Sequence, residues 1–266
     1  MGRVSERFAA LRARGEVALV PFVTAGDPDL ATTEALLPAL QAAGADLVEI
    51  GVPFSDPVGE GPTIQRASER ALASKTTLRR VLGLVRTLRP RLEIPVVLMG
   101  YANSFLTMGE ERFASSCAEV GVDAVICVDL PPEEGAEYRA ALEAQGVDPI
   151  LLAAPTTTPE RLALLARETR GFLYYVSLTG VTGARAQLAE GIAEQLARVR
   201  QVSEIPVCVG FGVSTPEHAR GLAGLADGVV VGSALVERVA GSRSIDEAVD
   251  TASRYIAELK APLRPA

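Results

Sequence analysis

Residues 47–65 read LVEIGVPFSDPVGEGPTIQ and join an apolar strand, a loop rich in Pro and Gly, and the start of a helix. The strand is expected over residues 46–52, and the helix is expected to begin near Pro62. One carboxylate, that of Glu49, stands inside the apolar run. Burying a carboxylate without a partner costs free energy, or the group stays protonated and its pKa rises. Such a residue is therefore retained either because a partner satisfies it or because the raised pKa is useful. By pattern alone, the alternative is an edge strand with Glu49 facing water.

The rest of the chain repeats this order of strand and helix, after a short amphipathic helix expected over residues 3–14. Strands alternating with helices imply parallel pairing, because a parallel pair needs a crossover. Eight such units in 266 residues predict one domain, residues 1–266, folded as a closed α/β (β/α)8 TIM barrel with an extra N-terminal helix. An open doubly wound sheet is the competitor, but no GxGxxG follows the first strand. The predicted strands are residues 17–24, 46–52, 94–99, 124–129, 148–153, 172–177, 206–211 and 228–232.

Composition excludes several classes of function. Hydrophobic residues make up 48% of the chain, and 26 basic against 33 acidic residues give a net charge of −7. Without a basic stripe, nucleic acid is not an expected partner, and an anion must be bound locally by backbone N–H groups. No apolar run reaches the roughly 18 residues that span a bilayer, and no signal peptide is present, so a cytoplasmic location is expected.

No metal site is predicted. The three cysteines, Cys117, Cys127 and Cys208, lack metal-ligand spacing and are expected to be buried, reduced thiols. The single histidine, His218, lies in the polar stretch TPEHAR and is expected on a helix surface, because a zinc site would need further ligands.

Strand alternation predicts where Glu49 points. Residues of one strand face opposite sides in turn, so Glu49 shares a face with Leu47 and Gly51. The opposite face carries apolar residues suited to pack on helices, namely Val48, Ile50 and Val52. Glu49 is therefore expected to point into the barrel lumen, where low dielectric tunes a carboxylate toward acid–base work near neutrality.

Glycine-bearing loops follow the last three predicted strands: Gly180–Gly183, Gly210–Gly212 and Gly232–Ser233. Glycine lets a backbone approach a ligand closely, and N–H groups at a helix start attract phosphate. Loops after the seventh and eighth strands are the usual phosphate site of these barrels. Apolar residues gather at the same end: Phe22, Met99, Tyr101, Tyr174 and Phe211. The residues thus predict a barrel enzyme that acts on a small phosphorylated substrate with an apolar half.

The chain resembles the α subunit of tryptophan synthase from about Arg7 to Leu259. The strings that carry the resemblance are long and in order: PFVTAGDP (21–28), ADLVEIGVPFSDP (45–57), GPTIQRA (61–67), MGYAN (99–103), DLPPEE (129–134), APTTT (154–158), GVTGAR (180–185), GFGVS (210–214) and ADGVVVGSALV (226–236). The resemblance implies cleavage of indole-3-glycerol phosphate to indole and glyceraldehyde 3-phosphate, within L-tryptophan biosynthesis.

The resemblance also implies roles for individual residues. Glu49 matches the family's general acid/base, and Glu60 stands where the family has its second catalytic carboxylate. Thr182 matches the threonine that closes over that second carboxylate. The phosphate-binding positions are Gly183, Gly212, Gly232 and Ser233, and the indole-pocket positions are Phe22, Ile64, Tyr174 and Phe211.

By the same resemblance, the chain is expected to bind a β subunit in an α2β2 tetramer. Pyridoxal phosphate is then expected only in that β partner, and no cofactor in this chain. The positions that match the family's surface for the β subunit are Pro53, Ser55–Ile64, Asn103 and Asp129–Pro132.

The chain departs from the family pattern at the second carboxylate. The family's loop usually reads DPxADGP or a close variant, whereas residues 56–62 read DPVGEGP, with Glu60 in place of Asp. The extra methylene displaces the carboxylate by roughly 1 Å unless the loop adjusts, and a shift of that size can cost about 100-fold in rate. Gly59 supplies slack in the loop. Two alternatives therefore stay open: a stand-alone or diverged indole-releasing lyase, and a catalytically weak allosteric activator of a β subunit.

Overall fold

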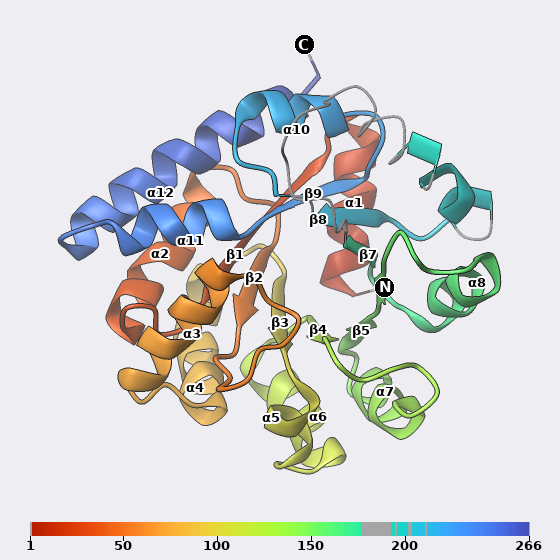
Figure 1. Cartoon of the computed structure of the whole chain (residues 1–266), viewed down its shortest axis with the longest axis horizontal. Helices are drawn as coiled ribbons and strands as arrows, with labels where there is room; N and C mark the ends of the chain where they lie inside the picture. The colour runs from red at the N-terminus through yellow and green to blue at the C-terminus, as the bar shows by residue number, and fades with distance from the viewer. Residues whose placement is uncertain (1, 177–192, 195, 202–203, 211, 266) are drawn as a thin grey trace.

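The structure is a computed structural model that describes residues 2–176, 193–194, 196–201, 204–210 and 212–265 (Figure 1). Nine strands lie in its described part, all parallel, in the sheet order β5-β4-β3-β2-β1-β9-β8-β7-β6. The predicted (β/α)8 TIM barrel is confirmed. The strands are β1 Ala18–Thr24, β2 Val48–Gly51, β3 Val96–Gly100, β4 Ala124–Cys127, β5 Asp148–Ile150, β6 Leu152–Ala153, β7 Leu173–Val176, β8 Val207–Gly210 and β9 Gly228–Val231.

The ninth strand arises because the fifth predicted strand is divided at Leu151. β5 pairs with β4, whereas β6 pairs with β7. The Leu151 carbonyl accepts a hydrogen bond from the Tyr174 N–H at 3.0 Å, so the chain exchanges partners within one residue. The two ends of the sheet order are thus consecutive in the chain, and the ring of strands closes there.

Helices surround the strands, as Figure 1 shows. The described helices are α1 Arg3–Ala13, α2 Leu30–Ala42, α3 Pro62–Ala73, α4 Leu78–Leu88, α5 Ala102–Leu106, α6 Glu110–Val120, α7 Ala136–Ala144, α8 Pro159–Glu168, α10 Pro216–Leu222, α11 Ser233–Ala240 and α12 Ile245–Lys260, with 3-10 turns at Arg89–Arg91 and Ala261–Leu263. The short helix α5 follows β3 after Tyr101, and its first N–H, of Ala102, donates to the Asp129 carboxylate at 2.7 Å. Throughout the described ranges, no helix has the length and apolarity to cross a bilayer.

The packing of β2 follows the predicted alternation. Val48, Ile50 and Val52 belong to the apolar cluster between the strands and the helices. Leu47 belongs to a second cluster, which fills the lumen. Helix α1 contributes three side chains to this lumen cluster: Val4, Phe8 and Leu11. The extra N-terminal helix therefore closes one end of the barrel, opposite the mouth.

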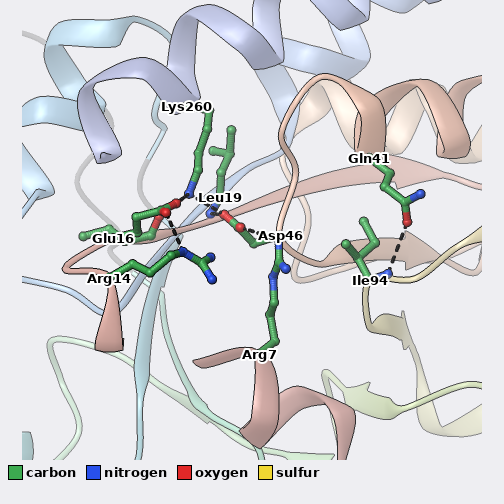
Figure 2. A network of polar contacts seen from close by, with 9 residues as sticks. Arg7, Arg14, Glu16, Leu19, Gln41, Asp46, Ile94 and Lys260 are labelled. Atoms are coloured by element: carbon green, nitrogen blue, oxygen red, sulfur yellow. Dashed lines mark hydrogen bonds and ion pairs between the residues drawn. The ribbon is translucent and has the colours of Figure 1, made fainter. Parts of the chain in front are cut away.

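A buried charge network ties this closed end together (Figure 2). The Lys260 ammonium, from α12, lies 2.8 Å from an Asp46 carboxylate oxygen and 3.1 Å from a Glu16 oxygen. Asp46 also accepts hydrogen bonds from the Leu19 N–H and the Arg7 guanidinium, each at 2.8 Å. Asp46 and Lys260 are each only 2% exposed, so each charge is both desolvated and well partnered.

The Asp46 arrangement recurs around the ring. Asp123 accepts from the Val96 N–H at 2.8 Å, and Asp227 accepts from the Val207 N–H at 2.9 Å. Each of these carboxylates also meets an arginine from α1: Arg3 reaches Asp123, Arg7 reaches Asp46 and Arg12 reaches Asp227, with N–O distances of 2.8, 2.8 and 3.6 Å. One short helix thus joins the starts of three strands.

Asp46→Ala is expected to lower the free energy of unfolding by about 3 to 5 kcal/mol, because it leaves the Lys260 ammonium and the Leu19 N–H short of a partner inside the protein. Urea unfolding measures the change. Arg243→Ala, which removes an exposed pair with Glu247, serves as control and is expected to leave the free energy of unfolding nearly unchanged. Equal effects of the two substitutions would contradict a stabilising role for the buried network.

Candidate active site

Glu49 points into the barrel, as its strand pattern predicts. It is 1% exposed, and its neighbours in register are Phe22 on β1 and Val97 on β3. Neither carboxylate oxygen of Glu49 has a hydrogen-bond partner among the described residues. A buried acid with both oxygens unpartnered is rare in proteins, and each such case calls for an explanation.

Burial, together with a smaller contribution from the negative charge of nearby Glu60, raises the pKa of Glu49 to about 8. The desolvated carboxylate favours its neutral form because water no longer stabilises the charge. At neutral pH the group therefore holds a proton that it can give to a bound molecule.

A cavity of about 330 Å³ opens above Glu49 at the mouth of the barrel. Its lining combines carboxylates, apolar side chains, and the loops after β8 and β9: Phe22, Glu49, Glu60, Ile64, Met99, Tyr174, Gly210, Gly212, Val213, Ser214, Val230, Gly232, Ser233, Ala234 and Glu237. Eight of the eleven residues to which the resemblance gives catalytic or binding roles line this cavity: Phe22, Glu49, Glu60, Ile64, Tyr174, Gly212, Gly232 and Ser233. Three others, Thr182, Gly183 and Phe211, lie outside the described residues.

Glu60 approaches the cavity from the loop between β2 and α3. Its carboxyl is half-buried, and this burial raises its pKa. The two acids therefore enter one cavity from different depths: Glu49 from the strand inside the barrel, Glu60 from the loop above it. Groups arranged in this way titrate apart, which suits one to hold a proton and the other a charge.

Two glycines in strands make room for the aromatic walls. A Cβ at Gly51 would lie 2.5 Å from the Phe22 ring, and a Cβ at Gly210 would lie 2.5 Å from the Tyr174 hydroxyl. Burial, and the charges of Glu49 and Glu60, raise the pKa of Tyr174 well above its usual range, so its hydroxyl stays protonated. The flat apolar wall thus depends on the missing side chains of these glycines.

The part of the cavity rim that follows β8 and β9 is suited to an anion. Helix α11 begins there at Ser233, with Gly232 as its N-cap. The first N–H groups of a helix have no intrahelical partner and carry partial positive charge. The neighbouring loop contributes Gly212, whose φ of +49° is a left-handed conformation that favours glycine.

The sequence pattern missed the contact between His218 and this rim. His218 lies on α10, as predicted, but it is half-buried, and its Nδ1 lies 3.4 Å from the Ser214 N–H, which donates to it. The two residues are four apart, and only the turn before α10 brings them together. Among the described residues, no three His, Cys, Asp or Glu side chains gather to hold a metal ion. The three cysteines are buried and unbridged, as expected.

One mouth of this barrel of parallel strands holds two carboxylates at different depths and the start of a helix. These features define the class of (β/α)8-barrel enzymes. The family model described as "Tryptophan synthase alpha chain" matches residues 8–263. The chain belongs to the tryptophan synthase alpha chain family.

Curated relatives and solved structures indicate the same family. The tryptophan synthase alpha chain of Geobacter sp. (strain M21) is 58% identical over 237 residues, 89% of each chain. That of Pelobacter propionicus is 49% identical over 98% of this chain and 97% of the relative. The crystal structure of tryptophan synthase subunit alpha from Legionella pneumophila str. Paris superposes with a TM-score of 0.92 at 37% identity, covering 99% of this chain and 98% of that one.

Glu49→Gln is expected to change how stability depends on pH. In the wild type, the folded state keeps the Glu49 proton up to a pKa of about 8, whereas the unfolded state loses it near 4.5. The folded state then binds more protons, so this group lowers stability as pH rises between those values. The free energy of unfolding of Glu49→Gln minus that of the wild type should therefore rise across this window, by at most about 1.4 kcal/mol per pH unit.

Denaturant unfolding at intervals from pH 4.5 to 9 measures this difference. Glu119→Gln, an exposed glutamate on α6, is the matched control and should give a constant difference. A flat profile for Glu49→Gln would mean that the carboxyl ionises normally in the fold.

Proposed function

We propose that this chain cleaves indole-3-glycerol phosphate to indole and glyceraldehyde 3-phosphate, the reaction of a tryptophan synthase α subunit. The observation that carries the proposal is the Glu49 carboxyl, which is buried, unpartnered among the described residues, and open to a cavity whose lining includes the start of helix α11. Membership of the family supports it over at least residues 8–263.

The reaction moves one proton. Cleavage breaks the bond between indole C3 and the hydroxyl-bearing carbon of the glycerol chain; C3 gains a proton, and the hydroxyl loses its own as the aldehyde forms. Neutral Glu49 delivers the proton to C3, and the resulting carboxylate accepts the hydroxyl proton. Glu49 thus ends each turnover as it began, so that one acid with a raised pKa serves both steps.

Glu60 supplies charge stabilisation in this scheme. Protonation at C3 places positive charge on the indole ring, toward its N–H. A carboxylate beside that nitrogen lowers the barrier, and it acts strongly because the apolar walls exclude water. The Glu60 carboxyl lines the same cavity as Glu49, which agrees with this role. The longer side chain replaces the family's Asp.

The remaining lining would bind the two ends of the substrate. We assign the indole to the walls formed by Phe22, Ile64 and Tyr174, together with Phe211. We assign the phosphate to Gly212, Gly232 and Ser233, together with Gly183. Thr182 would close over the Glu60 carboxylate. The assignments for Phe211, Thr182 and Gly183 depend on the sequence resemblance alone.

We also propose that the chain is a single domain that works with a tryptophan synthase β subunit in an α2β2 tetramer. One ring of strands takes in β1 through β9, which supports the single domain. The family's surface for the β subunit maps to loops after β2, β3 and β4, beside the cavity. In this proposal, pyridoxal phosphate belongs to the β partner, and the cleavage by Glu49 uses no cofactor.

Glu49→Gln is expected to lower kcat for indole-3-glycerol phosphate cleavage by about 10²- to 10⁴-fold, because an amide cannot donate the proton. Indole release, measured with and without a β subunit, tests this. Glu119→Gln on the outer surface should keep wild-type activity. If Glu49→Gln cleaves as well as the wild type, the proposed mechanism fails; a wild type that stimulates a β subunit but cleaves nothing would indicate the activator function instead.

Gly232→Ala is expected to raise KM about tenfold with little change in kcat, because a methyl group at the helix start removes roughly one phosphate hydrogen bond. The added Cβ would lie 3.6 Å from Phe22, an ordinary contact, and urea unfolding checks that alanine is accepted at the Gly232 backbone angles of φ −116° and ψ −89°. Gly83→Ala, at an open position on α4, is the control. Steady-state kinetics decide; an unchanged KM would remove Gly232 from the phosphate site.

A further inference from the structure

The loop that carries Glu60, residues 53–61, makes few hydrogen bonds to the barrel. Val58 at its tip is 86% exposed. The Glu60 N–H donates to the Pro57 carbonyl at 3.0 Å, within the loop itself. The Glu60 carbonyl accepts from Gln65, at the start of the adjoining helix α3, at 2.9 Å. These bonds shape the loop but do not fix its position over the cavity.

Tyr101 provides the connection to a separate strand. The Gly59 N–H donates to the Tyr101 hydroxyl at 3.0 Å. Among the described hydrogen bonds of residues 53–61, this one alone reaches beyond the loop and α3. It acts on the residue directly before Glu60, so it determines where the Glu60 side chain leaves the backbone.

Gly59 allows the loop to lie this close. A Cβ at Gly59 would lie 3.2 Å from both the Tyr101 hydroxyl and Val128 Cγ1, which is tighter than ordinary contact. Any larger residue would lift the loop away from Tyr101 or push the hydroxyl aside. The close approach lies directly before Glu60, the residue by which the loop lines the cavity.

Tyr101 is itself held firmly. It follows β3, is 4% exposed, and stacks on Phe54 with ring centroids 5.0 Å apart. The next N–H, of Ala102, donates to Asp129 after β4 at 2.7 Å. Burial raises the pKa of Tyr101 to about 12, so the hydroxyl stays neutral at working pH. Tyr101 is thus held at the end of β3, and it meets the loop twice, through the ring of Phe54 and through the N–H of Gly59.

We propose that Tyr101 is a positioning residue for the Glu60 carboxylate, acting through its hydrogen bond with the Gly59 N–H. The proposal depends on the proposed function, since it assigns Tyr101 to a reaction that uses Glu60. Tyr101→Phe keeps the ring and its stacking on Phe54 but removes the acceptor. Because a displacement of about 1 Å can cost 100-fold, kcat is expected to fall about 10- to 100-fold, with KM within about threefold of the wild type.

A double-mutant cycle separates positioning from a general structural effect. In a Glu60→Gln background, Tyr101→Phe should lower kcat by less than about twofold, because the group that it positions is already lost. Tyr138→Phe is the matched control: that hydroxyl is buried and has no described partner, and its removal should leave kcat within about twofold. Amide hydrogen exchange supplies a readout independent of turnover, since the Gly59 N–H should exchange faster in Tyr101→Phe than in either the wild type or Tyr138→Phe.

The outcomes are distinct. A large loss in Tyr101→Phe that persists undiminished in the Glu60→Gln background would overturn the proposal while leaving the proposed function intact. Unchanged kcat or unchanged Gly59 exchange in Tyr101→Phe would do the same. A wild-type chain that releases no indole, alone or with a β subunit, would end the proposed function and the role of Tyr101 together.

Discussion

The structure surrounds two buried acids of the same segment in opposite ways: Asp46 has polar partners, and Glu49 has none among the described residues. They are three residues apart and almost equally buried, at 2% and 1% exposure. Asp46 is partnered by an ammonium, a guanidinium and a backbone N–H, whereas neither oxygen of Glu49 has a described partner. Burying a charge requires such partners; where they are missing, the group keeps its proton. The segment therefore enters β2 through a stabilising network and carries an acid ready to donate its proton inside that strand.

The same division runs around the ring. At the closed end, Asp46, Asp123 and Asp227 each accept from the N–H of a neighbouring strand and from an arginine of α1. At the open end, the cavity is lined by glycines and by the start of helix α11, whose first N–H groups have no intrahelical partner. Barrels of this class place their chemistry at the strand C-termini and their stability at the other face. Here the separation is electrostatic: the charges are neutralised by partners at one end and left available to a ligand at the other.

How much of this could be predicted from the sequence depends on the range of the contacts. The inward direction of Glu49 follows from period-two alternation. Val48 and Ile50 pack against the helices outside the barrel, so the residue between them points inward. The meeting of Gly212, Gly232 and Ser233 follows from the rule that strand C-termini share one face. The division of the fifth strand at Leu151 could not be predicted, because it follows from closure of the ring. Contacts such as Ser214 with His218 leave no periodic signal, since they depend on the path of a single turn.

The two acids of the cavity cannot both ionise cheaply, so burial depth decides which one keeps the proton. Desolvation raises the pKa of both, but Glu49 lies deeper, and the Glu60 charge adds to its shift, so that it reaches about 8. The first negative charge therefore falls on Glu60, and that charge keeps Glu49 protonated. The Glu60 carboxylate reaches the cavity from a loop whose backbone lies within hydrogen-bond distance of Tyr101 at Gly59, so the placement of that backbone affects where the outer charge lies.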